Sequence, residues 1–250
     1  MFRRLATLIA GIGLATVVVP SGIAGAVNCS APLPQGSDGV VLDPADFVER
    51  IDNPYLPMPP GTRWTYRETD PEGSRQRVDV TVTSRTRAIL GIDAVVVHDK
   101  VTERGDLVEN TFDWYAQDAC GNVWYLGENT KEYEDGVVVS TAGSWEAGVD
   151  GAQAGVIMPA DPGIGLAYRQ EYLAGEAEDA AEILSLDEQA LVPFGHFRDV
   201  VLIKEFTPLH PRLLEYKLYA KGVGPVMTVG VSGDVGLEQL VSVHGQASGG

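Results

Sequence analysis

Basic residues are scarce in this chain. Its 250 residues include 18 Lys and Arg against 35 Asp and Glu, and the formal net charge is −17. A surface with this excess of negative charge repels phosphate backbones and anionic headgroups, so we expect no nucleic-acid partner and no direct binding to an anionic membrane. Cationic molecules and divalent ions stay open as partners, and so does the simpler interpretation of a well-solvated surface.

Long apolar runs are almost absent as well. The one extended run, residues 5–19, follows Arg3 and Arg4 and precedes small residues at 24–26. A positive end, a short apolar stretch and a small-residue cleavage site predict a signal peptide over residues 1–26. Its removal would leave 16 bases against 35 acids. We therefore expect a secreted protein, extracellular or periplasmic, that is not membrane-spanning.

Cysteine occurs only twice, as Cys29 and Cys120. An even count in an exported chain predicts a disulfide, which would tie the N-terminal arm to a turn in the middle of the chain. Zinc binding is the alternative, but two distant thiolates need further ligands, and no His has the spacing to supply them.

Motifs for catalysis or cofactor binding are also missing. The four histidines lie far apart, and no Ser or Cys nucleophile sits in a recognisable elbow beside them. Several acidic turns carry oxygen ligands, but none matches the regular twelve-residue calcium loop. We expect no metal and no cofactor, and an enzyme is the less favoured class.

Helical periodicity is rare, whereas short alternating runs bounded by turn residues recur along the chain. Residues 64–68, 77–82 and 88–101 are such runs. The pattern predicts an all-β fold with minor α content, a single strongly curved antiparallel sheet shaped as a half-barrel or partial barrel. We expect a Pro/Gly/Ser-rich arm over 27–42, one β-domain over 43–245 and a disordered tail over 246–250. Asp43 and Pro44 predict one short N-terminal helix that ends near Ile51.

Residues 107–135 hold the highest density of aromatic and acidic side chains. Two aromatic runs flank a cluster of turn formers at 118–122, which predicts a hairpin in the middle of the sheet. Because side chains alternate along a strand, Phe112 and Trp114 are expected on one face, with Asp113 and Tyr115 on the other.

Two kinds of site are candidates. An apolar concavity could be lined by indoles and by the Gly/Pro/Met-rich loop 155–166, and the residues assigned to it are Trp64, Trp114, Trp124, Trp145, Ile157 and Met158. Tryptophans in sheets also serve simply as core or cross-strand pairs. The second candidate is a carboxyl pair, Asp113 and Glu132, on neighbouring strands, the arrangement that a glycosidase needs. In a chain this acidic, such residues are also typical of a solvated surface.

Four phrases occur together in this chain: PPGTRWTY at 59–66, DWYAQD with GNVWY at 113–125, VPFGHF at 192–197 and YAKGVG at 219–224. Together they resemble a group of secreted bacterial β-proteins without assigned activity, which is similar in turn to the periplasmic lipoprotein-carrier half-barrel. The resemblance covers about residues 45–230 and implies an apolar concavity. It supplies no catalytic residue, and Cys120 departs from its pattern. Fold does not dictate function, so the activity must be argued from a site.

Three functions follow as hypotheses. The first is a secreted non-enzymatic binding protein for an apolar or amphipathic molecule, such as a lipid, held between the sheet and the loop 155–166. The second is a secreted hydrolase that acts on glycans through Asp113 and Glu132. The third is a cell-envelope interaction module without a small ligand.

Overall fold

The computed structural model describes residues 28–233 and 235–245. The strand predicted around residues 77–82 is present, and it belongs to a sheet that includes most of the chain. The predicted signal peptide 1–26 and the tail 246–250 lie outside the described residues. The strands form one 17-stranded sheet. In chain order they are β1 (Phe47–Val48), β2 (Arg63–Thr69), β3 (Arg75–Ile89), β4 (Ile92–Glu103), β5 (Asp106–Asp118), β6 (Val123–Asn129), β7 (Glu132–Glu134), β8 (Val137–Ser140), β9 (Trp145–Glu146), β10 (Gln153–Met158), β11 (Ala167–Arg169), β12 (Glu171–Tyr172), β13 (Ala180–Val192), β14 (Gly195–Phe206), β15 (Leu214–Ala220), β16 (Gly224–Ser232) and β17 (Gly236–His244).

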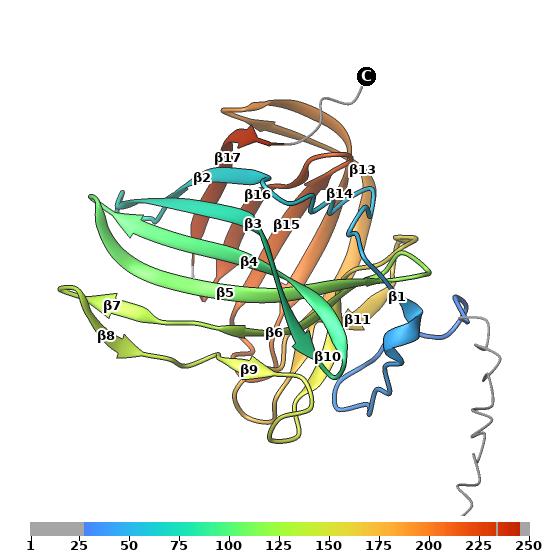
Figure 1. Cartoon of the computed structure of the whole chain (residues 1–250). Helices are drawn as coiled ribbons and strands as arrows, with labels where there is room; N and C mark the ends of the chain where they lie inside the picture. Colours follow the sequence, from blue (N-terminus) through green and yellow to red (C-terminus); the bar gives the residue numbers. More distant parts are fainter. Residues whose placement is uncertain (1–27, 234, 246–250) are drawn as a thin grey trace, which may run out of the picture.

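The sheet curls into a nearly closed barrel (Figure 1). Consecutive strands pair antiparallel from β2 to β6 and from β13 to β17, and β17 returns to pair with β2. Strand β10 joins the other side, because it pairs with both β6 and β12. The all-β antiparallel prediction is therefore confirmed. Nor does the described chain contain a helix with the length and hydropathy that a membrane span requires.

The predicted N-terminal helix is shorter than expected. It is one 3-10 turn, η1 (Pro44–Asp46), with the Asp43 side chain accepting a hydrogen bond from the backbone N–H of Ala45. Phe47 and Val48 then leave the helical path and pair with β5. The tertiary pairing with β5 outweighs the local helical pattern, since a short isolated helix is marginal in water.

The central hairpin forms as predicted. β5 and β6 pair antiparallel around the turn at 118–122, with Tyr115 opposite Tyr125 and Ala116 opposite Trp124. A bulge follows, because Trp114 lies opposite Gly127 while Tyr115 lies opposite Tyr125, which leaves Leu126 as the extra residue. Gly127 permits this bend, since its φ is +133° and a Cβ there would collide with the backbone of β9.

The inward face of the wall is largely aliphatic. Residues without accessible surface include Val82, Val123, Ile183, Ile203, Val226 and Leu240. Each such side chain contributes about 1.5–3 kcal/mol through removal from water. The aliphatic wall thus fixes the strand register, and it sets the position of the polar side chains that share its inward face.

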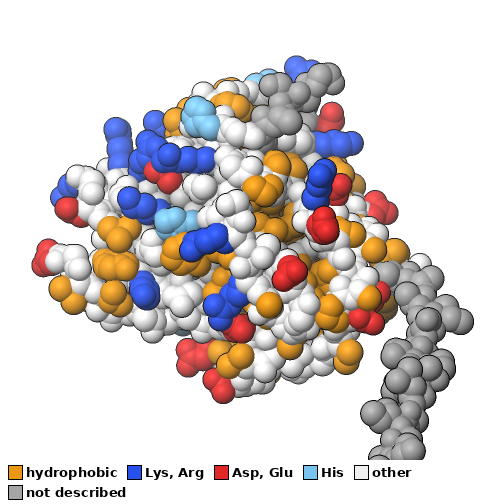
Figure 2. All heavy atoms as spheres, viewed as in Figure 1, with side chains coloured by type: hydrophobic (Ala, Val, Ile, Leu, Met, Phe, Trp, Pro, Cys, Tyr) orange, Lys and Arg blue, Asp and Glu red, His pale blue; other side chains and the backbone are white. Residues whose placement is uncertain are grey.

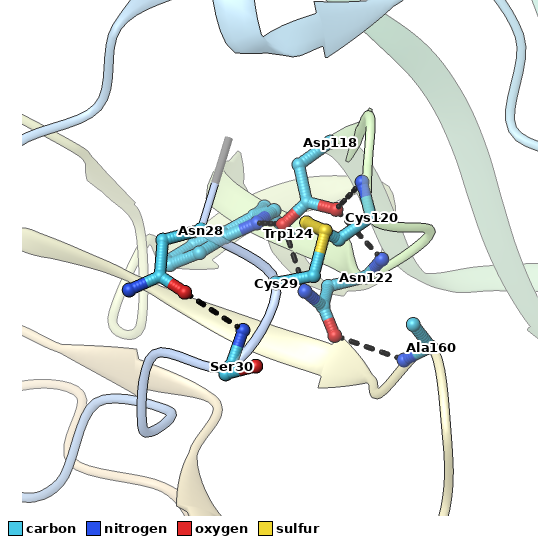
Figure 3. Close-up of a disulfide and its surroundings, with 8 residues drawn as sticks. All are labelled: Asn28, Cys29, Ser30, Asp118, Cys120, Asn122, Trp124 and Ala160. Carbon is cyan, nitrogen blue, oxygen red and sulfur yellow. Dashed lines mark hydrogen bonds between the residues drawn. A yellow bond between two sulfur atoms is a disulfide. The ribbon is translucent and has the colours of Figure 1, made fainter. Parts of the chain in front are cut away.

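The predicted disulfide is present. Cys29 and Cys120 are bonded, with their Cα atoms 5.3 Å apart and 91 residues between them in sequence. Beside the bridge, Asp118 accepts hydrogen bonds from the backbone N–H groups of Cys120 and Asn122 and from the Nε1 of Trp124 (Figure 3). The bridge and the Asp118 network hold the N-terminal arm against the turn of the central hairpin.

Candidate functional site

The inside of the barrel carries a polar cluster on its aliphatic wall. Strand alternation directs Asp113 inward, where it lies opposite Val97 on β4 and Glu128 on β6. Phe112 and Trp114 point outward on the same strand. This division between faces is the one that the alternation of residues 112–115 predicts.

One tyrosine hydroxyl joins two carboxyl groups. The Tyr125 hydroxyl oxygen lies 2.8 Å from Asp113 Oδ1 and 2.9 Å from Glu128 Oε2. A hydroxyl has a single proton and can donate it to only one of them. The second contact is therefore a hydrogen bond only if that carboxyl is protonated and donates to the tyrosine oxygen. The geometry thus favours one extra proton on the Asp113–Glu128 pair.

The pKa values follow the same direction. Burial raises the pKa of Asp113 to about 7, against an opposing effect of the Tyr125 hydrogen bond. Burial first, and then the charge of Asp113, raise the pKa of Glu128 to about 8. Carboxyl groups tuned to near-neutral pKa values can hold or transfer a proton at physiological pH.

A third carboxyl group lies close by. Glu171 Oε2 accepts a hydrogen bond of 2.7 Å from the indole Nε1 of Trp145, and the Trp145 ring packs edge-on against Tyr125 at 5.3 Å between centroids. Burial and the charge of Asp179 raise the pKa of Glu171 to about 9. The short strands β9 and β12 thus place Trp145 and Glu171 close to the carboxyl pair of Asp113 on β5 and Glu128 on β6.

Lys217 supplies a positive charge near these carboxyl groups. Its ammonium lies 2.6 Å from Glu205 Oε2, and Gln170 donates to the other oxygen of Glu205 at 2.9 Å. Burial is the largest effect on the pKa of Lys217 and lowers it, but the charges of Glu205, Tyr219 and Glu215 and the hydrogen bond to Glu205 together outweigh burial and raise the pKa well above its usual value. Although it points inward, the Lys217 side chain keeps 29% of its accessible surface. The inside of the barrel is therefore open to water-sized molecules at this point.

Two polar atoms near the cluster have no hydrogen-bond partner among the described residues. One is the hydroxyl of Tyr168, a residue with no accessible surface, and the other is Oδ1 of Asp99. Burial raises the pKa of Asp99 well above its usual value. A buried polar atom without a partner is costly, and such positions commonly meet water or a ligand.

The predicted tryptophan site is not assembled. Trp64, on the inward face of β2, is buried and donates its Nε1 to the carbonyl of Val223 at 2.7 Å. Trp145 also faces the interior. Trp114 and Trp124 lie on the outer face, Trp114 beneath Arg87 and Trp124 beside Phe47. Alternation separates the four indoles, so they do not line one concavity.

The segment 155–166 is not a loop over its whole length. Strand β10 covers Gln153–Met158 and pairs with β6 and β12, which corrects the expectation of an apolar loop over the site. Met158 has no accessible surface and Ile157 is half-buried. Met158 thus belongs to the core rather than to an open binding surface.

The carboxyl pair also differs from the expected one. Glu132 lies opposite Glu109, four residues before Asp113 on β5, and it is exposed. The partner of Asp113 is Glu128 instead. The bulge at Gly127 sets this register, and Gly127 is the one local signal that could have indicated it. Asp99, set between Val97 and Val101 on an otherwise apolar face, also points inward, but it was not among the predicted site residues.

No cluster of three or more His, Cys, Asp or Glu in residues 28–233 and 235–245 is arranged to hold a metal ion.

A scan of protein-family models finds no match to the chain, and a search of curated proteins finds none. Two solved structures have a similar fold at low identity. One, from Bacteroides fragilis, is described as an exported protein with a YmcC-like fold; it is 14% identical, with a TM-score of 0.47, and the alignment covers 76% of this chain and 99% of that one. The other, from Parabacteroides distasonis, is described as a lipoprotein; it is 13% identical, with a TM-score of 0.40, and the alignment covers 76% of this chain and 97% of that one.

Proposed function

We propose that this protein is an exported, non-enzymatic binding protein that holds an amphipathic small molecule inside its barrel. The observation that carries the proposal is the set of inward carboxyls around Tyr125, next to an interior that is open at Lys217. Asp113, Glu128 and Glu171 form the acidic end of this interior. A ligand with an amine or several hydroxyl groups matches them, because carboxyl groups accept hydrogen bonds from such donors.

Apolar side chains for the rest of such a ligand lie in the surface pocket that Glu171 lines, because Phe206, Pro208 and Pro211 belong to the same lining. Val82, Val97 and Ile203 face the interior, but they are packed in the core with at most 2% of their surface accessible. Binding sites for small molecules combine a mainly apolar lining with a few converging polar groups. A mixed lining of this kind supports an amphipathic ligand over a fully apolar one.

A pocket gives a route toward the acidic end. It has a volume of about 420 Å³, and its lining includes Glu171, Asp179 and Thr207 together with Gln35 of the N-terminal arm. The pocket therefore places Glu171 and Asp179 at the surface near β12 and β13. Entry by this route would bring a ligand first to Glu171.

The proposal is tested with decylamine and its charge-reversed counterpart decanoate. Tryptophan fluorescence of the mature chain should report decylamine binding through Trp145, and decanoate should bind more weakly because it meets acids. The double variant Asp113→Asn/Glu128→Gln should weaken decylamine binding roughly tenfold or more, the loss expected for a charge-assisted hydrogen bond. The matched control Glu132→Gln/Glu134→Gln removes two exposed acids and should leave the affinity unchanged.

Native mass spectrometry of protein purified from its own host gives a second, independent test. A reproducible extra mass that survives gentle ionisation supports the proposal. Protein that is always empty, together with no response to decylamine, contradicts it.

A glycan hydrolase is the second candidate, favoured by the contacts of the Tyr125 hydroxyl with both Asp113 and Glu128, which favour one extra proton on this pair. One protonated and one ionised carboxyl are the acid and the base or nucleophile of such an enzyme. Turnover of a glycan that disappears in both Asp113→Asn and Glu128→Gln would support this function. Turnover that survives the double variant would remove it.

A further inference from the structure

A groove on the outer face of the barrel is basic, in a chain of net charge −17. It has a volume of about 380 Å³ and crosses the strands from β3 to β6. The titratable side chains in its lining are all basic, namely Arg85, Arg87 and Lys131. The groove lies outside the barrel wall and is distinct from the polar cluster inside.

Aromatic rings hold the two arginines in place. The guanidinium carbon of Arg87 lies 4.3 Å from the ring centroid of Trp114, and that of Arg85 lies 5.3 Å from the centroid of Phe112. The Phe112 ring also stacks on His98 at 4.5 Å between centroids. Stacking of this kind fixes a guanidinium plane and leaves its N–H edge available for a ligand.

The charges of the groove are only partly neutralised. Arg87 forms an ion pair with Glu146 and donates to it through Nε at 3.1 Å. Arg85 and Lys131 are exposed and form no ion pair with any other described residue. The groove therefore holds two cations with exposed donors and a third that Glu146 already orients.

Charge segregation explains why the net charge does not describe this face. Inward-facing acids such as Asp113 and Glu128 lie behind the wall. Arg63 and Arg77 occupy outward positions of β2 and β3, where they share one acid, Asp79. Figure 2 shows Lys and Arg side chains gathered over β2 to β5 on the face drawn. The negative net charge therefore gives no argument against an anionic ligand at this groove.

We propose that the groove binds a carboxylated sugar unit of an acidic glycan. The planar fork of Arg85 matches a carboxylate with two parallel hydrogen bonds. Asn110 and Asn129 line the same groove, and their amides match sugar hydroxyls. Because His98 Nε2 contacts Asn110 Oδ1 at 2.7 Å, the amide NH₂ of Asn110 is the group left for a ligand.

Other anions fit the groove less well. Inorganic phosphate offers acceptor oxygens to Arg85 but has no sugar ring with hydroxyls for the amides of Asn110 and Asn129. The guanidinium groups of Arg87 and Arg85 cover the rings of Trp114 and Phe112. The groove therefore offers little exposed apolar surface to the acyl chain of a lipid. A sugar with one carboxylate and several hydroxyls satisfies both conditions.

Isothermal titration of the mature chain with trigalacturonate tests the proposal. The wild-type protein should bind it, with an affinity that falls as salt rises. The double variant Arg85→Gln/Lys131→Gln should weaken binding roughly tenfold or more, as expected from loss of charge-assisted hydrogen bonds. Arg75→Gln/Arg104→Gln removes the same charge from exposed positions outside the groove and should bind as the wild type does. Circular-dichroism melts of both variants accompany the titrations.

Three results would overturn the assignment. The first is no binding of trigalacturonate by the wild type. The second is equal weakening in the groove variant and the control variant, which would indicate net charge alone. The third is equal or tighter binding of neutral galactotriose, inorganic phosphate, phosphatidylglycerol vesicles or single-stranded DNA. Decylamine binding inside the barrel should be the same in both variants, so failure of this proposal and failure of the proposed function are distinguishable.

Discussion

Asp113 and Glu128 face each other across β5 and β6, and both reach the hydroxyl of Tyr125. This arrangement places two acids and one donor in a buried site. The stability of the central hairpin should therefore depend on the protonation of Asp113 and Glu128, and hence on pH.

Tyr125→Phe should destabilise the protein. The change removes a hydroxyl that contacts both carboxyls and leaves them without this donor, at a cost of about 1–3 kcal/mol in the free energy of unfolding. Urea denaturation at pH 7 measures the loss. The control is Tyr133→Phe on β7, whose hydroxyl makes no hydrogen bond with another described residue. Equal midpoints for the two variants would show that the shared hydroxyl does not contribute.

Stability should fall as the pH rises through neutrality. The pKa of Asp113 is raised from 3.8 to about 7 and that of Glu128 from 4.5 to about 8, mainly by burial. The folded state therefore binds more protons than the unfolded state between these limits. The stabilising contribution is complete below the unfolded pKa and is lost as the pH rises through the folded one, by up to about 1.4 kcal/mol per pH unit for each carboxyl.

Denaturant unfolding at pH 5, 7 and 9 measures this slope. The double variant Asp113→Asn/Glu128→Gln carries no charge at these positions, so its free energy of unfolding should depend less on pH than that of the wild type. Parallel pH profiles for the two proteins would contradict a shared buried proton.

Strand alternation and turn chemistry make the faces of the central hairpin predictable from sequence. Asp113 and Trp114 point to opposite sides because the side-chain period of a strand is two, and no tertiary information is needed for that. The Cys29–Cys120 bridge is predictable from the predicted signal peptide and the even number of cysteines. The strand faces follow from the local sequence pattern, and the disulfide follows from the expected oxidising environment of an exported protein.

The composition of the site depends on register and closure, which local pattern does not contain. An acid that alternates with apolar residues looks the same whether its face meets water or the inside of a barrel, so Asp99 and Lys217 gave no distinct signal. Trp114 and Trp145 are equally apolar, yet closure of the sheet puts one outside and one inside. Glu128 replaces Glu132 as the partner of Asp113 because one bulge shifts the register of β6.

Loss of the disulfide should lower stability more than most single substitutions. The double variant Cys29→Ser/Cys120→Ser opens a loop whose ends are 91 residues apart. In the chain-entropy model this costs about 4–5 kcal/mol. Guanidinium denaturation of the variant, and of the wild type with and without reductant, measures the effect. Unchanged midpoints in all three would mean that the arm contributes nothing to stability through the bridge.

Gly155→Ala should disrupt the closure of the barrel at β10. A Cβ at Gly155 would lie 2.6 Å from the carbonyl oxygen of Arg169 and still closer to the backbone of Gln170. Backbone cannot yield as a flexible side chain can, so β10 must move away from β11, and overpacking of this kind costs about 1–3 kcal/mol. Thermal unfolding followed by far-ultraviolet circular dichroism measures the loss.

Gly163→Ala is the matched control for this change. A Cβ at Gly163 meets no atom within 4 Å, and its φ is not in the left-handed region. The variant should therefore keep the wild-type midpoint or exceed it slightly, because alanine reduces the freedom of the unfolded chain. If Gly155→Ala unfolds at the same temperature as Gly163→Ala, β10 and the residues after β11 are not in close backbone contact. In that case the acidic end of the interior, which Glu171 reaches only through this contact, would not be held as described.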